Sequence, residues 1–112
     1  MNNKDKEIIR QIITYGKKLQ KMTQTIGSFE NFKNDKILFD SIISISSVIY
    51  ELSNKLSNQT KNQLSSINWE KISDYYQQIA SDFHELDLEK LWTALTTDLN
   101  SLLDKLEQYN LK

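Results

Sequence analysis

The stretch LEKLWTALTTDLNSLLDKLEQY, residues 88–109, carries the clearest helical pattern in the chain. Its apolar residues recur at steps of three and four, which is the spacing of side chains along one face of an α-helix. Asp87 precedes the stretch and can cap its first turn, and Glu89 adds negative charge where the helix dipole is positive. The stretch therefore predicts a long amphipathic helix whose apolar face comprises Leu88, Leu91 or Trp92, Leu95, Leu99, Leu102, Leu106 and Tyr109.

Three segments closer to the N-terminus show the same apolar spacing, over residues 8–26, 38–56 and 72–83. The 112 residues include no proline and two glycines, so long helices can run without a break, whereas an all-β domain would need more turn residues. This length suits a single domain over residues 1–112. We therefore predict an all-α fold, an up-and-down bundle of four to five helices.

Local chemistry predicts where the helices end. Gly27 and Ser28 interrupt the first helix, and residues 29–35 are short enough for one turn of helix before the second. Residues 57–68 are polar and small and are expected to form the connection into the third helix. Asn68, at the end of this connection, can accept a hydrogen bond from a free amide in the first turn of that helix.

Composition excludes several classes of chemistry. The absence of cysteine excludes disulfides, cysteine-bound zinc and thiol nucleophiles, and the two isolated glycines cannot build a phosphate-binding loop. Residues 1–13 carry charges throughout, and no apolar run approaches the ~20 residues that cross a bilayer. We expect no secretion signal, no membrane association and a cytoplasmic location.

Charge is distributed unevenly along the chain. Residues 1–60 carry nine basic and six acidic side chains, whereas residues 61–112 carry five basic and nine acidic ones. The C-terminal half would therefore repel phosphate, and RNA is only weakly supported as a partner. The best basic patch, at Lys17, Lys18 and Lys21, is small and is read as a solvated helix face.

The segment 38–56 has apolar residues on more than one face. Phe39, Ile43 and Tyr50 lie beside its main apolar stripe, and serines between its isoleucines would let another helix approach closely. Such a helix is either central in its bundle or buried in an oligomer. The pattern indicates a homodimer, with a wide core face as an equal alternative.

The only histidine, His84, lies among the carboxylates Asp82, Glu85 and Asp87. This spacing matches neither the HExxH zinc motif nor a calcium-binding loop, and we expect no metal and no cofactor. No strand-turn-helix context exists for a serine nucleophile. We interpret the cluster as a hydrated group of side chains near a helix end.

Three stretches together show a more specific pattern. Residues 28–57, SFENFKNDKILFDSIISISSVIYELSNKLS, carry Asp40 and Glu51; residues 67–72 read INWEKI, and residues 85–92 read ELDLEKLW. Their order and spacing resemble the HepT-like proteins of the HEPN superfamily, small helical domains encoded beside minimal nucleotidyltransferases. In that family the corresponding features are an acidic pair, an Ile-Pro-Trp opening of the third helix and a Val-Asp-Leu-Glu-x-x-Trp segment.

The resemblance spans roughly residues 5–108 and implies a family of metal-independent ribonucleases. Its active members use an Arg, four intervening residues, and then His-x-Tyr. Counting back from Trp92 without gaps places Tyr76 at the Arg position, Ser81 at the His position and Phe83 at the Tyr position. None of the three motif residues is present, so the resemblance implies a degenerate site.

This loss has a clear chemical cost. RNA cleavage through the 2′-hydroxyl needs a group that moves the proton and a cation for the developing phosphorane charge. Serine is no base near neutral pH, Tyr76 brings no positive charge, and the single arginine, Arg10, lies far away in the sequence. Each loss is worth about two to four orders of magnitude in rate. We therefore lean against an enzyme.

An alternative is a ribonuclease toxin with a rewired site. His84 follows Ser81 by three residues, about one helical turn, and would supply the base, with Lys71 or Lys90 as the cation. The neighbouring carboxylates would repel RNA phosphates, so we prefer an exposed histidine near a helix end.

In the described family systems, the nucleotidyltransferase silences the ribonuclease by transferring AMP onto the motif tyrosine. Phe83 has no hydroxyl to accept it, and Tyr75 and Tyr76 are nearby hydroxyls without a motif. The resemblance implies a homodimer in which Tyr76, Ser81, Phe83 and His84 line a shared groove. Our hypothesis is a degenerate member that binds a minimal nucleotidyltransferase in a toxin-antitoxin-type pair; a helical adaptor unrelated to such systems is a second alternative.

Overall fold

The computed structural model describes residues 1–81 and 87–109, with the backbone alone at Tyr76 and at residues 78–81. All regular structure in this part of the chain is helical, which confirms the all-α prediction. The elements in chain order are α1 (Asn3–Ile26), α2 (Phe29–Asn34), α3 (Lys36–Asn54), α4 (Asn58–Gln63), α5 (Trp69–Ser81), α6 (Leu88–Thr93), the π-helical turn η1 (Ala94–Asp98) and α7 (Leu99–Glu107).

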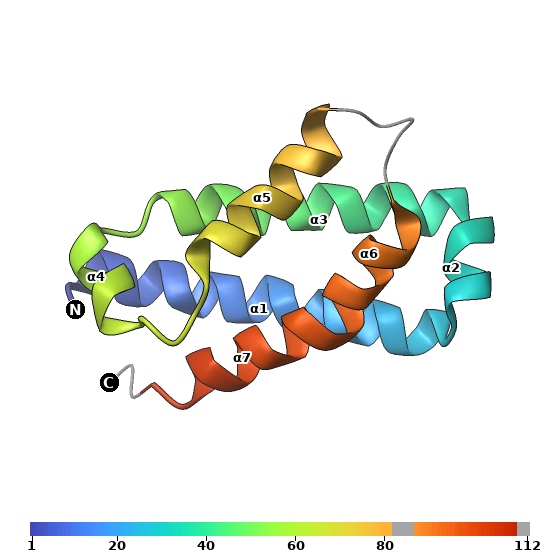
Figure 1. Ribbon diagram of the computed structural model, residues 1–112. Coiled ribbons are helices and arrows are strands. Elements are labelled where there is room, and N and C mark those ends of the chain that lie inside the picture. The colour runs from blue at the N-terminus through green and yellow to red at the C-terminus, as the bar shows by residue number, and fades with distance from the viewer. Residues whose placement is uncertain (82–86, 110–112) are drawn as a thin grey trace.

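Four long helical segments form the bundle and run alternately in opposite directions (Figure 1). The central helix α1 packs against α3 and against the continuous helix made of α6, η1 and α7, while α5 packs against α3. The short helices α2 and α4 lie at opposite ends of the bundle, in the connections on either side of α3 (Figure 1). The arrangement agrees with the predicted up-and-down bundle.

The core is aliphatic and centres on α1. Burial of such side chains is the main favourable contribution to folding, at about 25 cal/mol per Å² of apolar surface. The fully buried side chains come from helices distant in sequence and include Ile9, Ile12, Phe32, Ile42 and Leu106.

The predicted helix ends are confirmed. Gly27 ends α1 with φ at 81° and donates its N–H to the carbonyl of Thr23, a left-handed conformation that costs glycine little. Ser28 caps α2 through the amide of Asn31, at 3.1 Å. Asn68 accepts from the amide of Lys71 at 3.0 Å, as predicted for the start of α5.

The connection 57–68 contains a helix that the sequence did not predict, α4. Its cap is Ser57, which accepts from the amide of Thr60 at 3.2 Å. The hydroxyl of Ser57 donates to the carboxylate of Asp5 at 2.6 Å, and the Thr60 hydroxyl donates to the same carboxylate oxygen. Asp5 is 2% exposed. This contact with α1, more than 50 residues away, holds α4 in place.

The long C-terminal helix also differs from the prediction, because residues 94–98 form a π-helical turn. Four buried leucines, Leu91, Leu95, Leu99 and Leu103, follow one another at steps of four. In an α-helix each such step rotates the side chain by about 40°, about 120° over the three steps. The wider π turn takes up one extra residue and keeps all four on the core side.

The same rotation decides which leucine of α7 faces α1. Leu103 is 2% exposed, whereas Leu102, which the sequence placed on the apolar face, is only half-buried. Leu103 packs over Gly16, where a Cβ would lie 2.6 Å from Leu103 Cδ2. The missing side chain of Gly16 therefore allows α1 and α7 to approach closely.

Candidate functional site

The predicted site residues divide between described and undescribed parts of the chain. Tyr76 and Ser81 both lie on α5, but only their backbone is described. Phe83 and His84 lie outside the described residues. The predicted groove formed by these four residues therefore stays a prediction.

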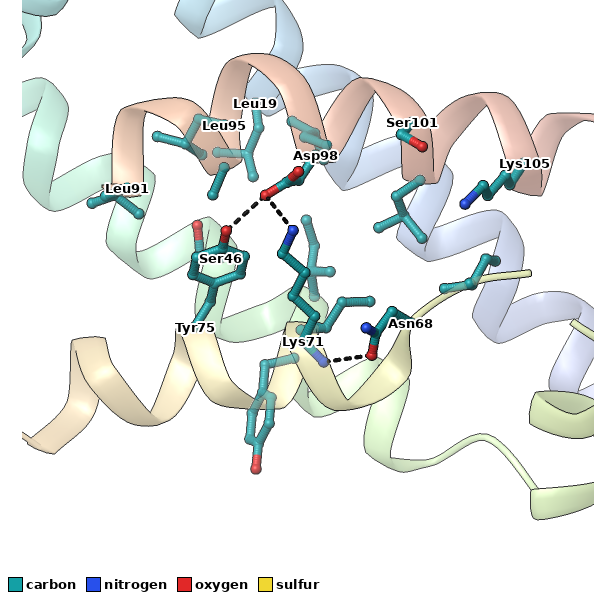
Figure 2. A pocket seen from close by; sticks show the side chains of 17 residues that line it. Leu19, Ser46, Asn68, Lys71, Tyr75, Leu91, Leu95, Asp98, Ser101 and Lys105 are labelled. Atoms are coloured by element: carbon teal, nitrogen blue, oxygen red, sulfur yellow. Dashed lines mark hydrogen bonds and ion pairs between the residues drawn. The ribbon is translucent and has the colours of Figure 1, made fainter. Parts of the chain in front are cut away.

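Two described side chains of α5 converge on a residue that the sequence analysis did not single out, Asp98. The phenolic hydroxyl of Tyr75 donates to Asp98 Oδ2 at 2.7 Å. The ammonium of Lys71 lies 3.3 Å from the same oxygen. Figure 2 shows both side chains reaching up from α5 to Asp98 on the opposite helix. These three residues, called here the Asp98 clamp, connect α5 to the π-helical turn.

The Asp98 clamp keeps Tyr75 protonated. Burial, and then the hydrogen bond and negative charge of Asp98, raise the pKa of Tyr75 to about 12. The phenol is therefore neutral across the physiological range and acts as a hydrogen-bond donor. A phenol in this state is a poor base and a poor nucleophile.

A cavity of about 290 Å³ opens between α5 and the helix formed by η1 and α7. Aliphatic side chains of α1, α3 and the continuous helix α6–η1–α7 form its floor, among them Leu19, Ile49 and Leu95. Polar groups border it: the Asp98 clamp, and further along α7 the side chains of Ser101 and Lys105. Figure 2 shows these residues around one space. The volume is near the lower limit of small-molecule sites, about 300 to 1,000 Å³.

The residues around Trp92 take up structural roles. Asp87 caps α6 by accepting from the amides of Glu89 and Lys90, as predicted. Trp92 stacks on Phe32 of α2 with ring centroids 5.1 Å apart, and α2 packs against α6. Asp87 and Trp92, two of the residues in ELDLEKLW that carry the resemblance, thus fix the start of this helix and its contact with α2.

The cations considered for the rewired site are dispersed or already paired. Lys71 contacts Asp98, and Lys90 is exposed in the first turns of α6. The single arginine, Arg10, is exposed on α1, with its guanidinium 3.5 Å from Glu7. Asp40 and Glu51 are both exposed on α3.

The described residues, 1–81 and 87–109, contain no group of three His, Asp or Glu side chains arranged to hold a metal ion. Asp82, His84 and Glu85 lie outside this part of the chain. None of the described helices combines the length and the apolar character required to cross a bilayer.

The sequence contained one signal for the Asp98 clamp. Steps of four in the leucine series from Leu91 to Leu103 predict either a drifting apolar face or a wider turn. A wider turn changes the direction in which the side chains of its own residues point. Asp98 is the last residue of this turn. Its pairing with Tyr75, 23 residues away, depends on tertiary structure.

Comparison with known sequences matches this chain to a protein family. The family model HepT-like, described as ribonuclease HepT-like, matches residues 12–109. No curated protein and no solved structure matches the chain.

Proposed function

Because the chain belongs to the HepT-like family, we propose that it keeps the family scaffold without its RNA-cleaving chemistry and acts by binding a minimal nucleotidyltransferase. The proposed setting is a toxin-antitoxin-type pair in the cytoplasm. The observation that carries the proposal is the composition of the motif positions, where Tyr76, Ser81 and Phe83 stand in place of Arg, His and Tyr. A chain with these residues has neither the base nor the cation that the reaction requires.

The contacts around α5 support the absence of catalysis. A replacement cation would have to be free to approach a phosphate, but Lys71 lies 3.3 Å from the Asp98 carboxylate. The hydroxyl of Tyr75, which adjoins the motif position Tyr76 in the sequence, already donates a hydrogen bond to the same carboxylate. The carboxylate itself would repel RNA phosphate. The described part of α5 therefore supplies no evident substitute for the missing groups.

We also propose that the chain forms a homodimer through α3. Ile37, at the start of α3, is 81% exposed, and Phe39, Ile43 and Val48 are half-buried. A helix with apolar side chains left partly uncovered on more than one face is typical of a helix that is central in its bundle or packs against a second chain. Analytical ultracentrifugation of the wild type and of Ile37→Glu tests this, with a shift toward monomer expected for the variant.

Two assays on the purified protein test the main proposal. Transcripts are incubated with the wild type and with His84→Ala, and we expect no cleavage by either protein above the level of buffer alone. In parallel, the product of the neighbouring reading frame, which we expect to be a minimal nucleotidyltransferase, is mixed with the chain, and we expect a stable complex on size-exclusion chromatography.

The two assays separate the alternatives. Cleavage by the wild type that disappears in His84→Ala would establish the rewired ribonuclease and overturn our choice. Absence of both cleavage and a complex would favour an adaptor unrelated to toxin-antitoxin systems. A catalytically active family member purified in the same way serves as the positive control for the cleavage assay.

A further inference from the structure

The cavity between α5 and α7 has an apolar floor, and no described side chain fills the space above it. Its floor is built from aliphatic residues of α1, α3 and the continuous helix α6–η1–α7, including Leu19, Ile49, Leu95 and Leu102. A volume of about 290 Å³ corresponds to roughly ten water-sized groups at about 30 Å³ each. A chain of about eight to ten carbons, or one or two fused rings, fits this space.

Two hydroxyls and one ammonium at the border of the cavity are available to a ligand. Ser46 of α3 and Ser101 of α7 line it, and neither hydroxyl makes a hydrogen bond with another described residue. Lys105 donates from Nζ to the carbonyl of Ser66 at 2.7 Å, and no described carboxylate pairs with it. The carbonyl is uncharged, so the positive charge of Lys105 is not neutralised.

The described charged side chains at the cavity therefore leave a net positive charge, which favours an anionic ligand. Among the described residues, three charged side chains line it: Lys71, Asp98 and Lys105. Lys71 and Asp98 compensate each other at 3.3 Å, and Tyr75 supplies a further donor to the carboxylate. The remaining charge is that of Lys105, which reaches in from α7 on the C-terminal side of Asp98, beside Ser101 (Figure 2).

We propose that this cavity is a binding site for a small amphipathic monoanion, such as a medium-chain carboxylate. The apolar body lies on the aliphatic floor, and the carboxylate accepts hydrogen bonds from Lys105 Nζ and the Ser101 hydroxyl. The proposal goes beyond the binding of a nucleotidyltransferase and does not depend on it, because it uses none of the motif positions on α5.

The π-helical turn gives independent support. Such turns occur often at functional sites, because they widen a helix at the cost of regular hydrogen bonding. Here the turn begins at Ala94 and ends at Asp98, and both residues line the cavity together with Leu95. The irregular part of the helix thus coincides with the wall of the proposed site.

The test is an NMR titration of the ¹⁵N-labelled full chain with sodium decanoate, with decylammonium as the cationic probe of the same length. We expect saturable shifts of amides in residues 67–75 and 91–105, and binding of decanoate at least about tenfold tighter than of decylammonium. Shifts confined to other parts of the chain, or equal affinity for both probes, would overturn the proposal.

Matched charge variants locate the anionic group. Lys105→Glu is expected to weaken decanoate binding about tenfold or more, whereas Lys18→Glu, the same charge change at an exposed position of α1, is expected to leave it unchanged. Lys105→Arg should retain binding. Equal losses in Lys105→Glu and Lys18→Glu would mean that net charge alone is responsible, which contradicts a specific site. Circular dichroism of each variant verifies that the bundle is folded.

A second copy of the chain is the competing occupant of the cavity. If sedimentation shows a dimer that decanoate cannot enter, and an exposed variant at the cavity border such as Ser101→Glu dissociates it, then the cavity is a protein interface and the proposal is wrong. Wild-type binding with unchanged sedimentation supports the small-molecule site.

Discussion

The α1 side of the bundle and the α5 side are held together by different means. Helix α1 contacts α3 and α7 through fully buried aliphatic side chains, with Gly16 under Leu103 at the closest approach. Helix α5 packs against α3, and its described contacts to η1 are polar, through the Asp98 clamp, beside an unfilled cavity. Close apolar packing resists local opening, whereas polar contacts near solvent contribute little net free energy. We conclude that stability resides mainly on the α1 side and that the α5 side is available for binding.

The largest expected effect is the loss of a core side chain on the α1 side. Ile9→Ala should lower the free energy of unfolding by about 3 to 4 kcal/mol, because Ile9 is fully buried and the cavity left behind is not filled. Ile72→Ala is the matched change on α5, where Ile72 is half-buried, and it should lower the free energy of unfolding by about 1 kcal/mol. Urea denaturation followed by circular dichroism measures both, and equal losses would contradict the comparison.

The next largest effect concerns the buried carboxylate that joins α1 to α4. Asp5→Ala should cost about 2 kcal/mol, because the hydroxyls of Ser57 and Thr60 lose a charged acceptor. Asp104→Ala, at an exposed position on α7, serves as the control and should change stability by less than about 0.5 kcal/mol.

This contribution also depends on pH. The hydrogen bond from the Ser57 hydroxyl, and then that from Thr60, hold the pKa of Asp5 below its ordinary value of 3.8. The folded state therefore releases this proton more readily than the unfolded state, so the stabilisation is fully present above about pH 4. It is lost as the pH falls through the folded-state pKa. The difference between wild type and Asp5→Ala should shrink at pH 2 to 3, and an undiminished difference would refute this account.

A smaller effect is expected at the close approach of α1 and α7. Gly16→Ala places a Cβ against Leu103, and we expect a net loss of about 1 kcal/mol after the gain in helix propensity is subtracted. The double variant Gly16→Ala with Leu103→Ala should lose less than the sum of the two single variants, because the shorter side chain at 103 makes room. Additive losses would show that the contact is relaxed in solution.

The smallest effect is expected for the Asp98 clamp. Tyr75→Phe should cost about 0.5 to 1 kcal/mol near pH 7, because one hydrogen bond to a partly exposed carboxylate is removed. The pKa of Tyr75 is raised from 10.0 to about 12, so the folded state holds this proton more tightly. The stabilisation is present below pH 10 and is lost as the pH rises toward 12.

Unfolding by urea at pH 8 and at pH 11 checks the prediction for the Asp98 clamp. The wild type should lose more stability between the two pH values than Tyr75→Phe does. If both proteins lose the same amount, the hydroxyl of Tyr75 does not titrate differently in the folded and unfolded states. A loss above about 2 kcal/mol for Tyr75→Phe at pH 8 would place α5 among the strongly held elements, against the comparison.

Features set by short stretches of sequence were predictable. The four apolar segments, the break at Gly27 and Ser28, and the caps at Asn68 and Asp87 depend on residues within a few positions of each helix end. Features set by distant residues were not. Helix α4 is held by Asp5, and the direction of Asp98 follows from the packing of a leucine series against α1.

The candidate site was predictable in part. The resemblance placed Tyr76 and Ser81 on one helix, and both lie on α5. The rewired-site alternative named Lys71 as a cation, and Tyr75 was named as a nearby hydroxyl without a motif. Neither indicated that a carboxylate on the opposite helix joins the two side chains. The spacing of residues within α5 could not predict this partner, because Asp98 contacts α5 only when the two helices are packed in the bundle.

The π-helical turn at Ala94–Asp98 has a consequence for aligning this chain with its relatives. A wider turn holds one residue more than the α-helical turn that it replaces. A relative with a continuous α-helix here would therefore be shorter by one residue, and an ungapped alignment would set its core leucine against Leu102 instead of Leu103. Placing a single gap inside residues 94–98 restores the correspondence on both sides and avoids an error of about 100° in the orientation of every residue beyond it.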